Sequence, residues 1–384
     1  MPDRVYLDWN ATTPLRPEAR QAMAAAWEVA GNPSSVHAEG RQARRLVEDA
    51  RAAVAAAVSA RPQDVVFSSG GTEANALALT PGLRRAAGEP VRRLLVSAIE
   101  HTSVLSGGRF AAEAIGTIKV TASGLLDLDH LRERLAEGAP ALVSVMLANN
   151  ETGVIQPVAE IADIVHTAGG LLHVDAIQAF GKIPFYIKSM RADLITLSAH
   201  KIGGLKGVGA LVMAEDVQDL EPLLRGGGQE LGRRAGTENV AGIAAFGAAV
   251  RAAMAALQGD AERLVGLRRR LEAGLREPPG MILFSVDSPR LPNTTLFTVP
   301  GLKAETAVIG FDLAGIAVSS GSACSSGKVQ PSHVLAAMGF DRELAQGAVR
   351  LSLGWSTSEA DIDLALEAWR KLADVLLRGR RNTA

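Results

Sequence analysis

The strongest constraint on the fold of this chain is a regular alternation of short apolar runs with helical patterns. The apolar runs have the length of buried strands, and the segments between several of them have the period of helices. In chain order, the strand-like runs are DVVFSS, RRLLVSAIE, ALVSVMLANN, LLHVDA, DLITLSA and VGALVMA. Helical patterns follow three of these runs, as GGTEANALAL, HTSVLSGGRFAAEA and VAEIADIVHTAG. Strands joined by crossover helices predict an α/β fold with a mainly parallel central sheet.

Polar residues follow nearly every one of these predicted strands. The segments are SSGGTE (68–73), EHTS (100–103), NNETG (149–153), DAIQ (175–178) and SAHK (198–201). In open α/β sheets, ligands bind beyond the carboxyl ends of the strands. Five polar strand ends in succession therefore indicate a binding or catalytic site at this edge of the sheet.

The C-terminal third of the chain predicts a second, smaller α+β unit. An alanine- and arginine-rich stretch at 239–277 indicates one or two long helices. After it, ILFSV, NTTLFTV and VRLSLGW resemble strands and are separated by helical segments. The ending TSEADIDLALEAWRKLADVLL opens with a Ser/Thr-x-x-acid capping pattern and continues as an amphipathic helix.

Composition and charge narrow the class of protein. The chain is 47% hydrophobic and 21% charged, with a formal net charge of −1, which is typical of a globular protein. Its basic residues are scattered, so we expect no nucleic-acid partner. The N-terminus lacks the pattern of a signal peptide, and the apolar stretch 240–250 ends at Arg251, too early to span a bilayer. We therefore expect a soluble, cytoplasmic protein that does not bind a membrane.

SSGGTE predicts a glycine turn between a strand and a helix that begins near Thr72. Free amides at the start of a helix bind anions, and the neighbouring hydroxyl groups add donors. An ordinary strand–helix turn is the alternative interpretation. Because no lysine follows at the spacing of a P-loop, a single phosphate on a small cofactor fits better than a nucleoside triphosphate.

Asp175 and Lys201 each follow a predicted strand directly. A buried carboxylate requires a cationic partner, which a protonated ring nitrogen of a cofactor would supply; an N-cap role is the alternative. A lysine held in a cleft can form a Schiff base, although most loop lysines lie at the surface. Together with the anion site, these two residues match the needs of pyridoxal phosphate.

Three further polar residues are candidates for the same site. His101 could stack on a cofactor ring and move protons, or it could cap a helix. Asn150 could hydrogen-bond the cofactor or the substrate, or it could belong to an Asn-rich turn. Arg350 could bind the carboxylate of an amino acid, or it could point to solvent from an edge strand.

Cys324 is the single cysteine of the chain and lies in SSGSACSSG, at residues 319–327. A lone cysteine is commonly a small buried hydrophobic residue, but this segment has no apolar period and favours a loop. One cysteine cannot form an internal disulfide, which fits a reducing compartment. The thiol is therefore a candidate reagent.

Taken together, these motifs resemble those of the cysteine desulfurases, the NifS- and IscS-type members of the class V aminotransferase family. The resemblance runs along the whole chain. Its motifs are YLDWNATTP (6–14), GNPSSVHAEGR (31–41), FSSGGTEANA (67–76), EHTSV (100–104), NNETGVIQP (149–157), HVDAIQAFGK (173–182), SAHKIGGLKGVGAL (198–211), GGGQELGRRAGTENV (226–240) and SSGSACSSG. It implies the fold type I architecture of pyridoxal phosphate enzymes, with a seven-stranded, mainly parallel sheet in the large domain. It also implies a large domain at 16–260, and a small domain formed by 1–15 and 261–384 with a mobile cysteine loop at about 319–330.

The resemblance assigns a role to each candidate residue. Lys201 is expected to form the Schiff base, Asp175 to pair with the pyridine nitrogen, and Cys324 to receive the sulfur as a persulfide. The remaining residues are expected to surround the cofactor or the substrate: His101 on the ring, Gln178 at the phenolic oxygen, Gly71, Thr72, Ser198 and His200 at the phosphate, Asn150 and Arg350 at the substrate. Thr237 is expected to reach the site of the second subunit of a homodimer.

The implied reaction converts L-cysteine to L-alanine and passes sulfur to a scaffold or carrier protein. The enzyme is expected to hold no metal of its own, although Cys324 could share an iron-sulfur cluster with a scaffold. Gly204, Leu205 and Leu231 depart from the pattern of the family, which leaves its fine specificity open. Selenocysteine lyase activity, another class V lyase or aminotransferase reaction, and a catalytically silent sulfur-transfer scaffold are the alternatives.

Overall fold

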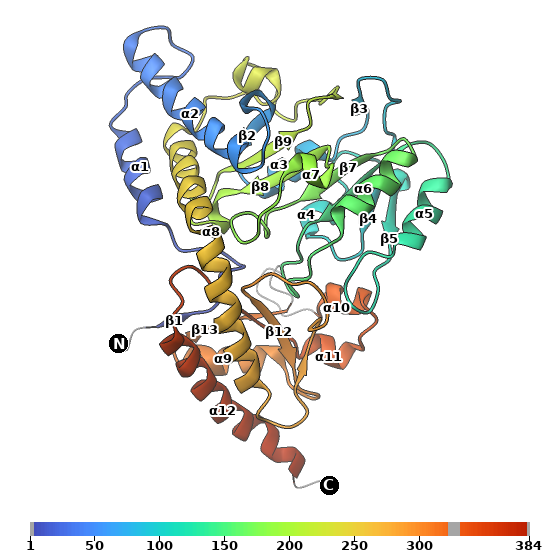
Figure 1. Cartoon of the computed structure of the whole chain (residues 1–384), viewed down its shortest axis with the longest axis vertical. Helices are drawn as coiled ribbons and strands as arrows, with labels where there is room; N and C mark the ends of the chain where they lie inside the picture. Colours follow the sequence, from blue (N-terminus) through green and yellow to red (C-terminus); the bar gives the residue numbers. More distant parts are fainter. Residues whose placement is uncertain (1–3, 322–330, 382–384) are drawn as a thin grey trace.

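The structure is a computed structural model that describes residues 4–321 and 331–381. A seven-stranded sheet forms its centre, in the order β2-β9-β8-β7-β6-β4-β5 (Figure 1). Only β9 runs antiparallel to its neighbours within this sheet, which confirms the predicted mainly parallel α/β fold. The strands are β2 Val65–Ser68, β4 Arg93–Ser97, β5 Ile115–Ile118, β6 Ala141–Met146, β7 Leu171–Asp175, β8 Leu194–Ser198 and β9 Gly209–Met213.

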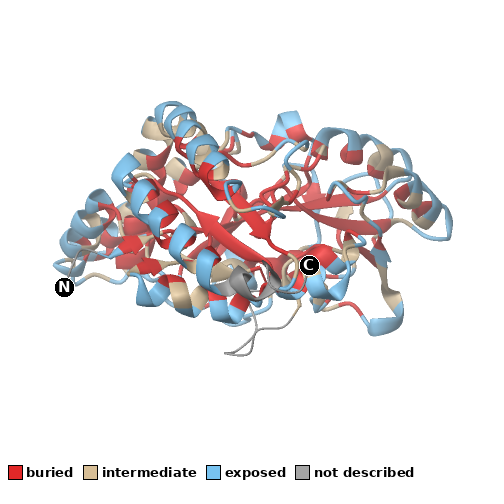
Figure 2. Ribbon diagram, turned by 90° about the horizontal axis from the view of Figure 1, so that it is seen from below, coloured by how far each residue is buried: buried red, intermediate tan, exposed pale blue. Residues whose placement is uncertain are grey.

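Helices cover both faces of this sheet, and the strands between them are buried along nearly all of their length, apart from the edge strand β5 (Figure 2). Helices α2, α5, α6 and α8 share one apolar core with the first face, and α3 and α4 share another with the second. The helices of this domain are α1 Pro17–Trp27, α2 Ala38–Ala57, α3 Gly71–Ala78, α4 Thr102–Leu105, α5 Leu128–Ala136, α6 Val158–Thr167 and α7 Ile187–Met190, followed by α8 Val240–Leu275. A short ribbon of β3 (Arg84–Arg85) and β10 (Val217–Gln218) lies outside the main sheet.

A second, four-stranded sheet forms the smaller unit, in the order β11-β12-β15-β14. Its strands are β11 Ile282–Leu283, β12 Thr294–Thr298, β14 Ser319–Ser320 and β15 Val349–Ser352. The N-terminal strand β1 (Val5–Tyr6) pairs with β13 (Ile316–Ala317) and so returns the start of the chain to this unit. The helices are α9 Ala304–Leu313, α10 His333–Ala337, α11 Arg342–Gln346 and α12 Glu359–Arg381.

The last helix, α12, has the predicted cap. The backbone N–H of Asp361 donates to the hydroxyl of Ser358, and the backbone N–H of Ser358 donates to the Asp361 carboxylate. These reciprocal bonds satisfy donors that the first turn of a helix leaves without partners.

Helix α8 belongs to both units. Phe246 and Ala253 lie in the core of the large sheet, whereas Leu264 and Leu271 lie in the core of the small unit. The predicted boundary at residue 260 falls between these two groups of side chains.

The expectation that the apolar stretch 240–250 is too short to span a bilayer needs correction, because its helix continues past Arg251 to Leu275. In the described part of the chain, α8 is the one helix with the length and hydropathy of a membrane span. Its apolar side chains are largely those that pack into the two cores.

The helical pattern expected at 101–114 was wrong over most of its length. Only one α-helical turn, α4, and a short 3-10 turn at Ala112–Ala114 form there, and between them Gly107 and Gly108 adopt positive φ angles of 79° and 59°. A left-handed backbone at two successive residues ends a helix. The chain turns at this point and leads into β5, the edge strand of the sheet, which the pattern of apolar runs does not predict.

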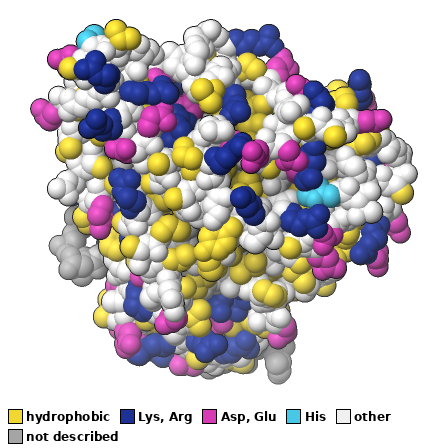
Figure 3. All heavy atoms as spheres, turned by 45° about the horizontal axis from the view of Figure 1, so that its top comes forward, with side chains coloured by type: hydrophobic (Ala, Val, Ile, Leu, Met, Phe, Trp, Pro, Cys, Tyr) yellow, Lys and Arg dark blue, Asp and Glu magenta, His cyan; other side chains and the backbone are white. Residues whose placement is uncertain are grey.

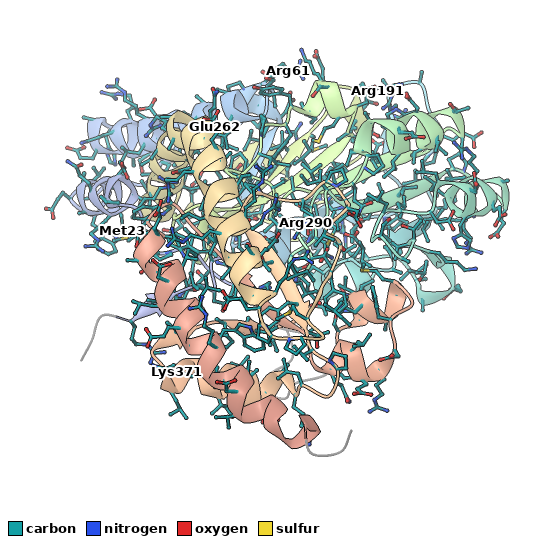
Figure 4. All side chains as sticks on the ribbon, turned by 60° about the horizontal axis from the view of Figure 1, so that its bottom comes forward. Met23, Arg61, Arg191, Glu262, Arg290 and Lys371 are labelled. Atoms are coloured by element: carbon teal, nitrogen blue, oxygen red, sulfur yellow. The ribbon has the colours of Figure 1, made fainter. Side chains whose placement is uncertain are left out.

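The two units meet through backbone pairing beside the NNETG turn. The N–H of Leu291 donates to the carbonyl of Gly153, and the N–H of Ile155 donates to that of Pro289. Arg290, labelled near the middle of the molecule in Figure 4, pairs with Glu272 of α8 at 2.9 Å. The two backbone bonds hold the second unit against the carboxyl edge of the main sheet, and the ion pair anchors their segment to α8.

The glycines of α8 provide a test of its packing against α2. A Cβ at Gly247 would lie 2.6 Å from the Cα of Ala50, whereas a Cβ at Gly259 meets nothing within 4 Å. We predict that Gly247→Ala lowers the free energy of unfolding by ~1–3 kcal/mol through overpacking. Gly259→Ala is the matched control and should raise it by ~0.5–1 kcal/mol, because alanine favours a helix. Urea unfolding measures both, and equal stabilisation of the two variants would contradict this packing.

Candidate active site

The polar strand ends converge on one cavity of about 310 Å³ at the carboxyl edge of the main sheet. Of the predicted site residues, Gly71, Thr72, His101, Asn150, Asp175, Gln178, Ser198, His200, Lys201 and Arg350 line this cavity. Thr237 does not line it and lies exposed on the segment before α8. Cys324 lies outside the described residues.

The start of α3 forms one end of the cavity. A Cβ at Gly71 would lie 2.3 Å from Cδ1 of Ile177, so this position accepts no side chain without displacing a wall of the site. The N–H groups of the first helical turn have no acceptor within the helix and favour an anion. Ser198 and His200 come from the end of β8 and the turn after it, and burial lowers the pKa of His200 to about 4.

Asp175 ends β7 and is nearly fully buried. Its carboxylate accepts hydrogen bonds from Nδ2 of Asn75 at 2.9 Å and from the backbone N–H of Ile177 at 3.0 Å. Burial raises the pKa of Asp175, while these bonds and the nearby His101 and Lys201 oppose the rise. The alternative N-cap role is wrong, since no helix begins after Asp175 within residues 176–186.

Lys201 ends the short helical turn after β8 and projects into the cavity. Its Nζ donates to the backbone carbonyls of Asn10 at 2.5 Å and Ala11 at 2.9 Å. The N-terminal segment thus positions the amine at the floor of the cavity.

Arg350 lies on β15, which has β12 and β14 as neighbours, so the alternative of an edge strand is wrong. It is 2% exposed. Its guanidinium donates to Asp8 at 2.7 Å and to the backbone carbonyl of Asn150 at 2.9 Å. Its Nε is buried and has no partner among the described residues. A ligand carboxylate in the cavity would complete its hydrogen bonding.

His101 caps a helix, as one interpretation expected, and it also lines the cavity, while its role on the cofactor ring stays a prediction. Its Nδ1 accepts from the backbone N–H of Ser103 and lies 2.8 Å from the Ser103 hydroxyl. Burial lowers the pKa of His101, with Lys201 and His333 acting in the same direction and Asp175 opposing them. The ring is therefore favoured in its neutral form, which can exchange a proton.

Three residues of the site were missed: Asn10, Lys182 and Asn75. Lys182 donates to Oε1 of Gln178 at 2.6 Å and to Oδ1 of Asn10 at 2.9 Å. Burial lowers the pKa of Lys182 well below its ordinary value. All three stand inside the quoted motifs, so the resemblance carried the signal, but neither Asn10 nor Asn75 directly follows a predicted strand.

The residues of this cavity fit pyridoxal phosphate. A side-chain-free helix start suits the phosphate, a buried carboxylate suits a protonated ring nitrogen, and an amine in the same cavity suits the aldehyde. The observation that tests the fit is Gly71, where any side chain would fill the space beside Ile177.

The fold and the site together define an α/β enzyme that acts on small amino compounds. The family model for aminotransferase class-V matches residues 5–365, and the chain belongs to this family. Within the family it is a cysteine desulfurase of the NifS and IscS type. It is 44% identical over 383 residues to the cysteine desulfurase of Cereibacter sphaeroides, with 97% of each chain covered.

Solved structures agree with this family assignment. The NifS-like protein of Rickettsia africae is 38% identical, with a TM-score of 0.88 and coverage of 97% of this chain and 99% of that one. SspA, solved in complex with cysteine, is 28% identical, with a TM-score of 0.76 and coverage of 91% of this chain and 98% of that one.

Glu151 of the NNETG turn generates a prediction on pH. It is buried and accepts a hydrogen bond from the Ser332 hydroxyl, and burial raises the pKa of Glu151 to about 7. The neutral form of Glu151 stabilises the folded protein fully below about pH 4.3, which is the ordinary pKa of a glutamate in an unfolded chain. This stabilisation is lost as the pH rises through about 7. Glutamine cannot ionise, so the Glu151→Gln variant escapes this loss. From about pH 5 to about pH 8, its free energy of unfolding should rise relative to that of wild type by roughly 2–3 kcal/mol.

Urea unfolding at several pH values measures this gain. The exposed Glu133 of α5 supplies the control, and Glu133→Gln should track wild type at every pH. A Glu151→Gln curve that stays parallel to wild type would show that Glu151 is already ionised in the folded protein.

Proposed function

We propose that this enzyme uses pyridoxal phosphate to convert L-cysteine to L-alanine and passes the sulfur to Cys324 as a persulfide. The observation that carries the proposal is the convergence of Lys201, Asp175 and Arg350 on one cavity. An amine, a buried carboxylate and a buried arginine are the groups that this cofactor and the carboxylate of an amino acid need.

Each residue has a task that follows from its position. Pyridoxal phosphate, when bound, withdraws electrons from the Cα of an attached amino acid. Arg350 holds the substrate carboxylate from the small unit. Lys201 accepts the Cα proton, and His101, whose low pKa favours its neutral form, assists the transfer.

The sulfur step balances without an added oxidant. The Cys324 thiolate attacks the substrate sulfur, so that a sulfur–sulfur bond forms and the carbon–sulfur bond breaks. The electron pair of the broken bond goes to carbon, where a proton completes alanine. Overall, a cysteine and a thiol become an alanine and a persulfide.

The segment that carries Cys324 is attached on both sides to the substrate site, which supports its role. On one side, Ser319 pairs with Arg350 between β14 and β15. On the other side, the Ser332 hydroxyl donates to Glu151, the residue after Asn150. The described residues on both sides of this segment therefore contact the substrate site, as we expect of a segment that presents the sulfur acceptor.

We further propose that the enzyme is a homodimer, that it works in a reducing cytoplasm and that it passes sulfur on to an accepting protein. Apolar side chains form yellow patches among the charges in Figure 3, and the large domain exposes several large apolar side chains. Among them are Trp27 (68% exposed) and Leu231 (68%), and Leu231 lies on the same segment as the exposed Thr237. Burial of this surface against a second copy would bring Thr237 toward the partner's site, and analytical ultracentrifugation tests the dimer.

The central prediction concerns Cys324→Ala. Wild type should release alanine and, with a reductant, sulfide from L-cysteine, whereas the variant should lose both products yet keep the yellow absorbance of the bound cofactor. The neighbouring Ser325→Ala is the control and should keep its activity. A yellow Cys324→Ala protein with wild-type turnover would favour another lyase or an aminotransferase. A colourless wild-type protein would favour the silent scaffold, and faster turnover of selenocysteine would favour the lyase alternative.

A further inference from the structure

A line of buried polar groups crosses the face of the main sheet behind Asp175. On this face the strands present leucines toward their amino ends, namely Leu142, Leu171 and Leu194. Two residues further along each strand, the side chains change to Ser144, His173 and Thr196, all fully buried. The register places Ser144 opposite His173 and Thr196 opposite Asp175.

These side chains form a continuous hydrogen-bond chain that ends at Asp175. Ser144 Oγ lies 2.8 Å from Nδ1 of His173, and Nε2 of His173 lies 3.3 Å from Oγ1 of Thr196. Thr196 Oγ1 donates to Oδ1 of Asn75 at 2.7 Å. Nδ2 of Asn75 then donates to Asp175 at 2.9 Å and to the Ser103 hydroxyl at 2.9 Å.

The direction of this chain follows from which atoms can donate. The Thr196 hydroxyl has one proton, and because this proton goes to Asn75, its oxygen accepts from Nε2–H of His173. His173 is then the neutral tautomer whose Nδ1 accepts from Ser144. Burial supports this neutral state, since it lowers the pKa of His173 to about 3.

The opposite direction would change the state of Asp175. If Thr196 donated to His173, Asn75 would turn its NH₂ toward Thr196 and its oxygen toward Asp175. Two acceptors would then face each other unless Asp175 took up a proton. The tautomer of His173 and the protonation of Asp175 are thus coupled through Thr196 and Asn75.

We infer that Ser144, His173, Thr196 and Asn75 are positioning residues that hold Asp175 as an ionised acceptor toward the cofactor. The same Asn75 amide orients Ser103, whose hydroxyl donates to Nδ1 of His101 and so leaves the proton of the neutral ring on Nε2. One chain of hydrogen bonds therefore determines which atoms of Asp175 and His101 donate and which accept toward the cavity. This inference rests on the proposed binding of pyridoxal phosphate.

The consequence is spectroscopic. An ionised Asp175 keeps the ring nitrogen of the cofactor protonated. A protonated ring in turn lowers the basicity of the second nitrogen, which links the cofactor to Lys201. Weakening the hydrogen-bond chain should therefore raise the midpoint of the absorbance titration, which is the pH at which half of the change in the visible band has occurred. The other ionisable groups around Asp175 are Lys201, His101 and Glu100, and none of the substitutions below changes them.

The test is a pH titration of the visible absorbance of purified, cofactor-loaded protein. Thr196→Val keeps the shape of the side chain but removes both hydrogen bonds, and we expect its midpoint to rise by about one pH unit or more. Thr196→Ser keeps the hydroxyl and should restore the wild-type midpoint. Thr298→Val, at a fully buried threonine of β12, controls for the general effect of burying a valine and should not shift it.

Ser144→Ala removes only the far end of the chain and serves as a second, milder variant should Thr196→Val not fold. It should shift the midpoint in the same direction by a smaller amount. Unchanged midpoints in the foldable variants would overturn the inference. A wild-type protein without a visible band would instead overturn the proposed cofactor, so the two failures are distinguishable.

Discussion

The hydrogen bonding of Asn10 holds the active site and the two structural units together. Its backbone carbonyl accepts from Lys201 and Gln178, on the floor of the cavity. Its side-chain amide donates to the Asn150 carbonyl and to Thr294, while its side-chain oxygen accepts from Asn293 and Lys182. Asn10 is 1% exposed and bonded to residues of both units, so it can be buried only with all these partners in place. The two units are thereby fixed to each other at the site.

Much of the site could be predicted because parallel strands bring their carboxyl ends to one edge. Asp175, Ser198 and Lys201 end strands or follow them closely, so their convergence follows from topology. Asn10 and Asn75 could not be found in this way, since one lies in an N-terminal turn and the other inside α3. Their importance depends on partners a hundred residues or more away.

The misjudged elements of the fold have a common physical cause. Residues 101–114 have helical composition, but the contact between Arg109 and Leu79 and the left-handed Gly107 and Gly108 override it. The run IGTI is too short and too polar to mark a strand, yet it pairs with β4 at the edge of the sheet. In both cases tertiary contacts decided the local structure.

The site holds more buried ionisable groups than stability alone would favour. Glu100, Glu151, Asp175, Lys182 and Arg350 lie within or beside one cavity, and burial raises or lowers the pKa of the first four. Such groups cost folding energy unless each is paired, and they gather where a charged ligand will complete the pairing.

The division of these groups between the two units has a chemical consequence. The amine, the carboxylate and the anion site belong to the large sheet, whereas Arg350 and both attachments of the cysteine segment involve the small unit. In the proposed function, the large unit therefore fixes the cofactor, and the small unit fixes the amino acid and carries the segment with the sulfur acceptor. Because Arg350 is itself held by Asp8 and by the Asn150 carbonyl, the substrate is aligned by the same junction that joins the units. Any displacement at this junction changes binding and sulfur transfer together, since both depend on one set of contacts.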